Sequence, residues 1–128
     1  MAERTKRVVS TPGFVADPNS LQRGGGVTID WDKVPATDGR KVVRGGTLMT
    51  DGDAGAYPAS ADASAATFIL TTNAAQDSKS DAISGYGDLR GGVLYKNLLP
   101  EANEADFETR LGALTQFTFL TYRDQRGV

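Results

Sequence analysis

Hydrophobic residues fall into short clusters along the chain, separated by polar and glycine-rich stretches. Residues Val27–Asp32 alternate apolar and polar side chains, which is the pattern of a strand with one buried face. Residues Thr67–Thr72 are short, β-branched and apolar, which indicates a buried strand. Further short runs predict strands over residues 41–44, 47–50, 91–95 and 116–122. The polar stretches 51–66 and 73–90 are expected to be surface loops.

One short helix is predicted before the last strand. Asn103 is a candidate N-cap, and Asp106 three residues later resembles a capping box. Phe107, Leu111 and Leu114 follow at a spacing that places them on one helical face. The predicted fold is therefore mainly β: a small β-rich domain of short strands, barrel-like or sandwich-like, with one short helix near the C-terminus and an extended N-terminal arm.

The beginning of the chain differs from the rest in composition. Prolines and a run of three glycines interrupt residues 1–26, which predicts a flexible N-terminal arm. Apolar pairs within this segment are expected to act as anchors on a binding partner, namely Val8, Val9, Phe14 and Val15. The expected hinge consists of Gly24, Gly25 and Gly26. The β-rich domain is expected over residues 27–122 and a polar end over 123–128.

The large apolar residues of the predicted strands and helix are candidates for the core or for an interface between copies. They are Val27, Ile29, Trp31, Phe68, Leu70, Phe107, Leu111, Phe117 and Phe119. Trp31 is the only tryptophan, and the pattern does not decide between a core position and an interface position. The core is lean, since hydrophobic residues make up 39% of the chain and 15 residues are glycine. Association with copies of the chain or with a partner is a plausible supplement.

Composition removes most catalytic chemistry. The chain has no cysteine and no histidine, which excludes disulfides, thiolate metal sites and imidazole bases. Asp51 and Asp53 begin like a calcium loop, but the glycine and glutamate that such a loop requires are replaced by Ala56 and Asp62. Arg-Gly-Gly occurs three times, and each occurrence is better explained by a glycine turn before a strand. We therefore expect no enzyme, no catalytic residue, no metal and no cofactor.

Charge and hydropathy bear on partners and location. Residues 1–44 carry a net charge of +3 and residues 45–128 a net charge of −5, so the front of the chain is expected to contact something different from the body. No apolar run is long enough to span a bilayer, and the charged N-terminus has no apolar stretch after it. The sequence predicts a protein made in a cytoplasm.

The chain resembles the lambda-type head decoration proteins of tailed bacteriophages. The resemblance rests on Phe68–Leu70, on the segment Gly91–Ala102 with the sequence GGVLYKNLLPEA, and on the following helix and closing strand Phe117–Phe119. The segment Val27–Thr50, with a VTID strand and a later GGT element, is similar to the start of that domain. The resemblance covers about residues 27–122 and concerns pattern and element order.

This resemblance implies a mostly β fold that forms homotrimers on the outside of the expanded capsid, at three-fold and quasi-three-fold positions. The implied partner is the major capsid protein, the implied location is the virion exterior, and the role is to cement the shell against DNA pressure. No nucleic acid, membrane or small-molecule substrate is implied. The alternatives are another phage structural subunit, such as a tail-tube or head-completion protein, and a single-strand nucleic-acid-binding β-barrel that uses Trp31, the tyrosines and the Arg-Gly-Gly sites.

Overall fold

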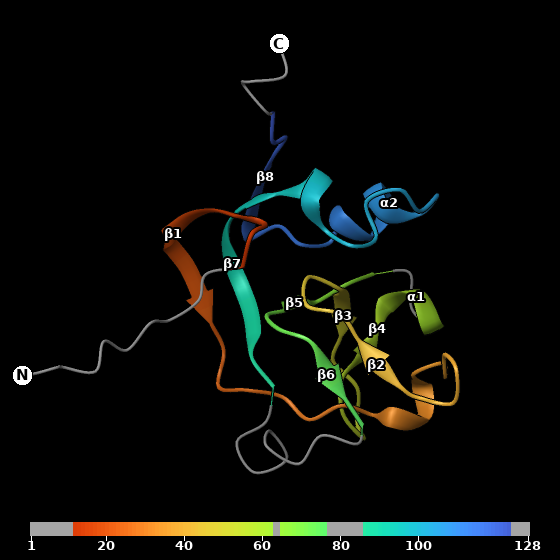
Figure 1. Cartoon of the computed structure of the whole chain (residues 1–128). Coiled ribbons are helices and arrows are strands. Elements are labelled where there is room, and N and C mark those ends of the chain that lie inside the picture. The colour runs from red at the N-terminus through yellow and green to blue at the C-terminus, as the bar shows by residue number, and fades with distance from the viewer. Residues whose placement is uncertain (1–11, 63–64, 77–85, 124–128) are drawn as a thin grey trace, which may run out of the picture.

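A mixed, mostly antiparallel sheet with β7 at its centre organises the molecule (Figure 1). The computed structural model describes residues 12–62, 65–76 and 86–123. In that part of the chain, five strands follow one another across the sheet in the order β1 (Val15–Arg23), β7 (Asp88–Tyr95), β5 (Phe68–Leu70), β3 (Leu48–Thr50) and β4 (Tyr57–Pro58). The sixth strand, β8 (Phe117–Leu120), pairs with β7 in parallel, with Gly92 opposite Phe117.

Smaller elements surround this sheet. A second sheet of two strands pairs β2 (Val42–Val43) with β6 (Ala74–Ala75). The helices are short, and they are the 3₁₀ turns η1 (Trp31–Lys33) and η2 (Lys96–Leu98) and the α-helices α1 (Ala59–Asp62) and α2 (Phe107–Leu111). The prediction of a mainly β fold is confirmed. The main sheet is open rather than closed into a barrel, because β1 and β4 at the ends of its order do not pair with each other in the described structure.

The main sheet is buried on both faces at β5. Phe68, Ile69 and Leu70 in β5 are all 0% exposed. Successive side chains of a strand point to opposite faces, and here Ile69 belongs to one hydrophobic cluster while Phe68 and Leu70 belong to another. The first cluster includes Phe107 and the second includes Val43, so α2 and β2 contribute to different sides of the core. Burial on both faces explains why this strand is an uninterrupted apolar run.

The predicted strand over Val27–Asp32 is wrong. Only isolated bridges occur there, between Val27 and Tyr86 and between Ile29 and Ala56, and the chain then turns into η1 at Trp31. Asp30 caps this turn by accepting a hydrogen bond from the backbone N–H of Asp32. The alternating pattern indicated the buried side correctly, since Ile29 is buried. It did not distinguish a strand from an extended segment with single bridges.

The short helix near the C-terminus is confirmed as α2, but it begins later than the capping pattern suggested. Asp106 is the residue before its first turn, and Asn103 lies three residues upstream in a turn. The stretch 51–66 was expected to be loop, and it contains the short strand β4 and the single turn α1. Small residues dominate this stretch, so its apolar pattern was too weak to predict either element.

The predicted N-terminal arm over residues 1–26 differs from the structure from Val15 onward. Residues Val15–Arg23 form β1, which pairs antiparallel with β7. Phe14 and Val15 are 7% and 8% exposed and belong to the first hydrophobic cluster, so they are core residues rather than free anchors. Residues Val15–Arg23 form a strand because the edge of β7 is available to pair with them. The pairing is irregular, with several register shifts, so it tolerates the proline in this segment. Val8 and Val9 lie outside the described residues.

Candidate protein-interaction surface

The strands at the borders of the main sheet differ in how well they are protected against further pairing. β1 carries exposed Asp17 and Pro18, and its register against β7 shifts at several points. β4 is two residues long and ends in Pro58. Charge, proline and bulges are the features by which proteins block strand addition. β8 has none of them, since Phe117–Leu120 is uncharged and pairs regularly with β7.

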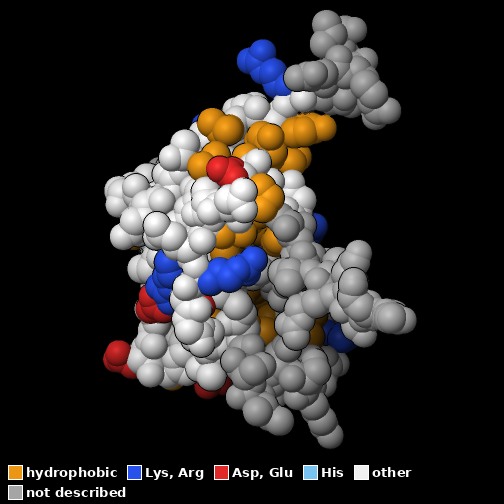
Figure 2. Space-filling view, turned by 90° about the vertical axis from the view of Figure 1, so that its left-hand side faces the viewer, with side chains coloured by type: hydrophobic (Ala, Val, Ile, Leu, Met, Phe, Trp, Pro, Cys, Tyr) orange, Lys and Arg blue, Asp and Glu red, His pale blue; other side chains and the backbone are white. Residues whose placement is uncertain are grey.

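Exposed apolar side chains lie at the C-terminal end of β8 and in the neighbouring turn η2. Of the four large hydrophobic residues that are most exposed in the described structure, three lie here: Leu98 at 42%, Leu120 at 45% and Tyr122 at 44%. Figure 2 shows hydrophobic side chains near the upper end of the molecule, which is the end where Figure 1 places β8. We call Leu98, Leu120 and Tyr122, together with the outer edge of β8, the β8 surface.

Tyr122, two residues after β8, is held in place by several contacts. The backbone N–H of Tyr122 donates to Oδ1 of Asn97 over 2.7 Å, and Nδ2 of Asn97 donates to the carbonyl of Tyr122 over 3.0 Å. The Tyr122 ring also meets Tyr95 edge-on, with 5.3 Å between ring centroids. These contacts fix Tyr122 before any partner binds, which lowers the entropy cost of binding at this residue.

The candidate core or interface residues are mostly in the core. Six of the nine are buried in the isolated chain, and they are Ile29, Phe68, Leu70, Phe107, Leu111 and Phe117. Val27, Trp31 and Phe119 are partly buried and pack against the hydrophobic clusters. Trp31 meets Tyr86 edge-on at 6.3 Å. The residues that form the β8 surface were not among these candidates.

The predicted glycine hinge is a fixed crossing in the structure. The N–H of Gly24 donates to the backbone carbonyl of Asp88, and the N–H of Gly26 donates to Oδ1 of the same residue, both over 3.0 Å. A methyl group at Gly24 would collide with the Asp88 carboxylate. Gly26 has a φ of 98°, which favours glycine. These glycines therefore allow a close backbone approach to Asp88, and the segment is bound to β7 rather than free.

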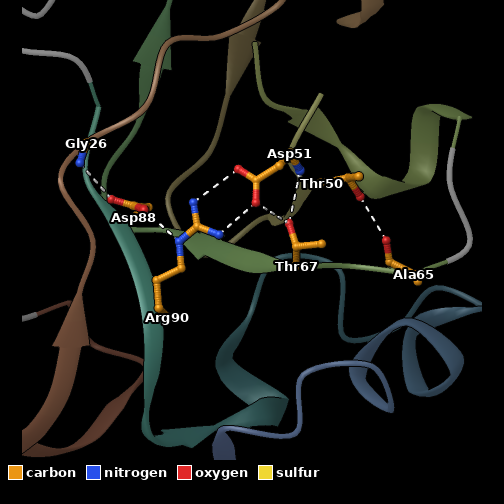
Figure 3. Close-up of polar contacts among 7 residues, drawn as sticks. All are labelled: Gly26, Thr50, Asp51, Ala65, Thr67, Asp88 and Arg90. Carbon is orange, nitrogen blue, oxygen red and sulfur yellow. Dashed lines mark hydrogen bonds and ion pairs between the residues drawn. The ribbon is translucent and has the colours of Figure 1, made fainter. Parts of the chain in front are cut away.

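Arg90 of β7 connects this crossing to Asp51, the residue that follows β3 (Figure 3). Its Nε donates to Oδ2 of Asp88 over 2.7 Å, and its two terminal nitrogens donate to the carboxylate of Asp51. The guanidinium also lies over the Phe68 ring at 4.3 Å. The hydrogen bonds from Arg90 lower the pKa of Asp51, with a further contribution from Thr67. Arg90 belongs to one of the Arg-Gly-Gly sites, and its contacts are those of a structural residue.

A second buried polar cluster lies beside α2. Glu101 is 7% exposed and accepts a hydrogen bond from the backbone N–H of Leu48 over 2.9 Å. Arg110 is 8% exposed and lies 3.2 Å from Glu104 but 3.9 Å from Glu101. Burial raises the pKa of Glu101, and the Leu48 hydrogen bond opposes this shift only in part. This cluster was not among the sequence-predicted sites, although residues 101–110 contain four acidic residues and one arginine.

Neither the described residues nor known proteins identify an activity. Among residues 12–62, 65–76 and 86–123, no group of three or more acidic side chains is arranged to hold a metal ion. Within the same part of the chain, no helix has the length and apolar character needed to cross a membrane. No protein-family model, curated protein or solved structure matches the chain.

Proposed function

We propose that this chain is a head decoration protein of a tailed bacteriophage. In this proposal it binds the outside of the expanded capsid as a homotrimer, at three-fold and quasi-three-fold positions, and stabilises the shell. The observation that carries the proposal is the β8 surface, because an uncharged strand edge with exposed Leu120 and Tyr122 gains free energy when another protein covers it. The sequence resemblance over residues 27–122 supports the choice of a capsid setting.

The β8 surface is assigned to contacts between copies of the chain. A lysine at position 120 would place a charge in that contact while leaving the core unchanged, because Leu120 is 45% exposed in the isolated chain. We expect Leu120→Lys to shift a trimer toward monomer in sedimentation equilibrium. Val42→Lys is the matched control, since Val42 is 43% exposed and lies in β2. A monomeric parent protein, or equal loss of trimer in both variants, contradicts this assignment.

The capsid contact is assigned to the segment before β1, with Val8 and Val9 as its apolar anchors. Phe14 and Val15 no longer belong to this set, because both are buried in the core. In this proposal the segment binds by adding a strand to a sheet edge of the capsid protein. Each contact is weak, but three segments on one trimer raise the effective concentration and give firm attachment.

The decisive experiment mixes the purified protein with empty expanded and unexpanded shells of the phage that encodes it. We expect selective uptake by expanded shells, measured by co-sedimentation and by density on the shell exterior. Deletion of residues 1–11 leaves β1 intact and is expected to abolish uptake without unfolding the body, whereas deletion into β1 removes core residues as well. Equal uptake by both shell forms, or none by either, rejects the decoration role. Unchanged uptake after the deletion removes only the segment from the mechanism.

A further inference from the structure

The tripeptide Thr-Asp-Gly occurs twice in the chain, at residues 37–39 and 50–52. In an Asp-Gly pair the backbone nitrogen of the glycine can reach the side-chain carboxyl of the aspartate, because glycine has no Cβ to hinder the approach. The two copies share their reacting residues and differ in their surroundings. They are therefore a matched pair for the effect of the fold on this chemistry.

The first copy stands at the exposed tip of a tight turn. Residues 37 and 40 exchange two backbone hydrogen bonds, of 2.7 and 3.0 Å. Asp38 and Gly39 between them have φ values of 53° and 77°, and positive φ at both central residues is typical of a type I′ turn. Within the described structure no hydrogen bond or ion pair involves the Asp38 carboxylate. A methyl group added at Gly39 would meet no heavy atom within 4 Å beyond its chain neighbours, so this pair has a free carboxyl group and room to rotate.

The second copy is held by its neighbours (Figure 3). The terminal nitrogens of Arg90 donate to the Asp51 carboxylate over 2.7 and 3.1 Å, and the Thr67 hydroxyl donates to it over 3.0 Å. These hydrogen bonds, chiefly those from Arg90, lower the pKa of Asp51 and keep it ionised. A methyl group added at Gly52 would lie 2.7 Å from the Gly55 carbonyl oxygen, so rotation there is hindered. The Asp51 side chain is still 50% exposed, so contacts rather than access to water separate the two copies.

We propose that Asp38 is a site of spontaneous isomerisation to isoaspartate and that the fold protects Asp51 from the same reaction. The Gly39 nitrogen attacks Cγ of the protonated Asp38 carboxyl group, a C–N bond forms, and the proton of the nitrogen leaves with the carboxyl OH as water. Water then opens the resulting succinimide. Addition at Cγ restores aspartate, whereas addition at the main-chain carbonyl carbon leaves Gly39 linked through Cγ. One water is released and one is taken up, so the reaction needs no co-reactant. This proposal is independent of the proposed function.

The consequence of the reaction is confined to the turn. The new linkage passes through Cβ and adds one backbone atom between residues 38 and 39, which breaks the pair of hydrogen bonds between residues 37 and 40. The chain beyond the turn is anchored separately. Nζ of Lys41 donates to the Trp31 carbonyl over 2.7 Å, and the Lys41 carbonyl accepts the N–H of Gln76 over 3.0 Å. The turn can therefore open while the sheets remain folded.

The test incubates the purified full-length protein at near-neutral pH and physiological temperature. Trypsin separates the two copies into the peptides 34–40 and 45–79, and electron-transfer fragmentation distinguishes isoaspartate from aspartate in each. We expect isoaspartate to form at Asp38 at least about tenfold faster than at Asp51, because charge-assisted hydrogen bonds must break before Asp51 reacts. Equal rates, or a faster reaction at Asp51, overturn the proposal.

The unfolded chain in concentrated urea is the matched control, because both copies lack their folded contacts there. We expect similar rates at the two positions in urea. A ratio as large as that in the folded protein would mean that the flanking sequence decides, and it rejects protection by the fold.

Two variants assign the reaction to its groups. Asp38→Glu keeps the charge but lengthens the side chain, and it is expected to abolish isomerisation in the peptide 34–40 while the rate at Asp51 stays unchanged. Thr67→Val removes one hydrogen bond from Asp51 and is expected to accelerate the reaction at Asp51 alone. Equal acceleration at both positions, or at neither, contradicts protection of Asp51 by these contacts.

Discussion

The Nε atom of Arg90 lies 2.7 Å from Oδ2 of Asp88, and the Asp88 side chain is only 2% exposed. The other oxygen of this carboxylate accepts the N–H of Gly26. The buried Asp88 carboxylate, at the start of β7, is held by Arg90 of the same strand. It also binds Gly26, and so attaches the segment that follows β1 to β7. This relationship explains why the glycine run is fixed in the folded protein, and it identifies the groups whose removal should loosen that attachment.

Replacement of Arg90 by methionine should destabilise the protein by about 2–4 kcal/mol. The substitution keeps part of the side-chain volume but leaves the buried Asp88 without its charged partner, which is the costly way to break such a pair. The midpoint of urea unfolding measures the effect. The double variant Asp88→Asn with Arg90→Met should recover part of the loss. If the single variant unfolds at the parent's urea concentration, the ion pair contributes nothing to stability.

The glycines at positions 24 and 25 should respond differently to alanine. Gly24→Ala places a methyl group against the Asp88 carboxylate and should cost about 2 kcal/mol or more, since overpacking forces neighbouring groups to move. At Gly25 no heavy atom lies within 4 Å of the added methyl group, so alanine there should be neutral or stabilising by about 0.5 kcal/mol. Thermal unfolding of both variants measures the difference. Equal effects at the two positions would show that the crossing is not constrained by Asp88.

Threonines 71 and 67 form a second matched pair. The hydroxyl of Thr71 is buried and has no hydrogen-bond partner within the described structure, so Thr71→Val should stabilise the protein by about 1 kcal/mol. The hydroxyl of Thr67 donates to Asp51 and accepts from the Asp51 N–H, so Thr67→Val should destabilise it by about 0.5–1.5 kcal/mol. Chemical denaturation gives both free energies of unfolding. A destabilised Thr71 variant would mean that its hydroxyl has a partner.

Stability should depend on pH through two carboxyl groups with opposite shifts. Burial raises the pKa of Glu101 above its ordinary value of 4.5, so the folded state takes up this proton at a higher pH than the unfolded chain. As pH falls through that raised pKa toward 4.5, Glu101 favours folding, and below 4.5 it adds nothing further. Asp51 acts in the opposite sense. The ionised Asp51 stabilises the folded state at pH values above 3.8, the ordinary pKa of an aspartate. This stabilisation is lost as the pH falls through the lowered pKa of Asp51 in the folded protein.

Two substitutions separate these contributions. Glu101→Gln should remove the gain in stability on mild acidification, and Asp51→Asn should reduce the loss at lower pH. Urea midpoints measured from neutral to acidic pH test both, with the parent protein in the same buffers. If the Glu101 variant keeps the full gain on mild acidification, another group is responsible for it.

The amino-acid sequence by itself determined the class of fold and most of the buried positions. The run Phe68–Leu70 predicted a buried strand, and the spacing of Phe107 and Leu111 predicted a helix with one buried face, because strand and helix periods leave different apolar patterns. The absence of histidine and cysteine excluded whole classes of chemistry, because no other side chain supplies an imidazole or a thiolate. These inferences depend on local spacing or on composition alone.

Only the tertiary structure decided which distant segments of the chain pair with and bind one another. Residues Val15–Arg23 read as an interrupted arm, and they become β1 because β7, more than sixty residues away, supplies an edge and Asp88 supplies acceptors for the glycines that follow. The β8 surface and the buried Glu101 cluster likewise combine residues that are far apart in the chain. Local patterns record which side chains avoid water, but pairing between remote strands and the shape of a cleft depend on contacts that no short window of sequence contains.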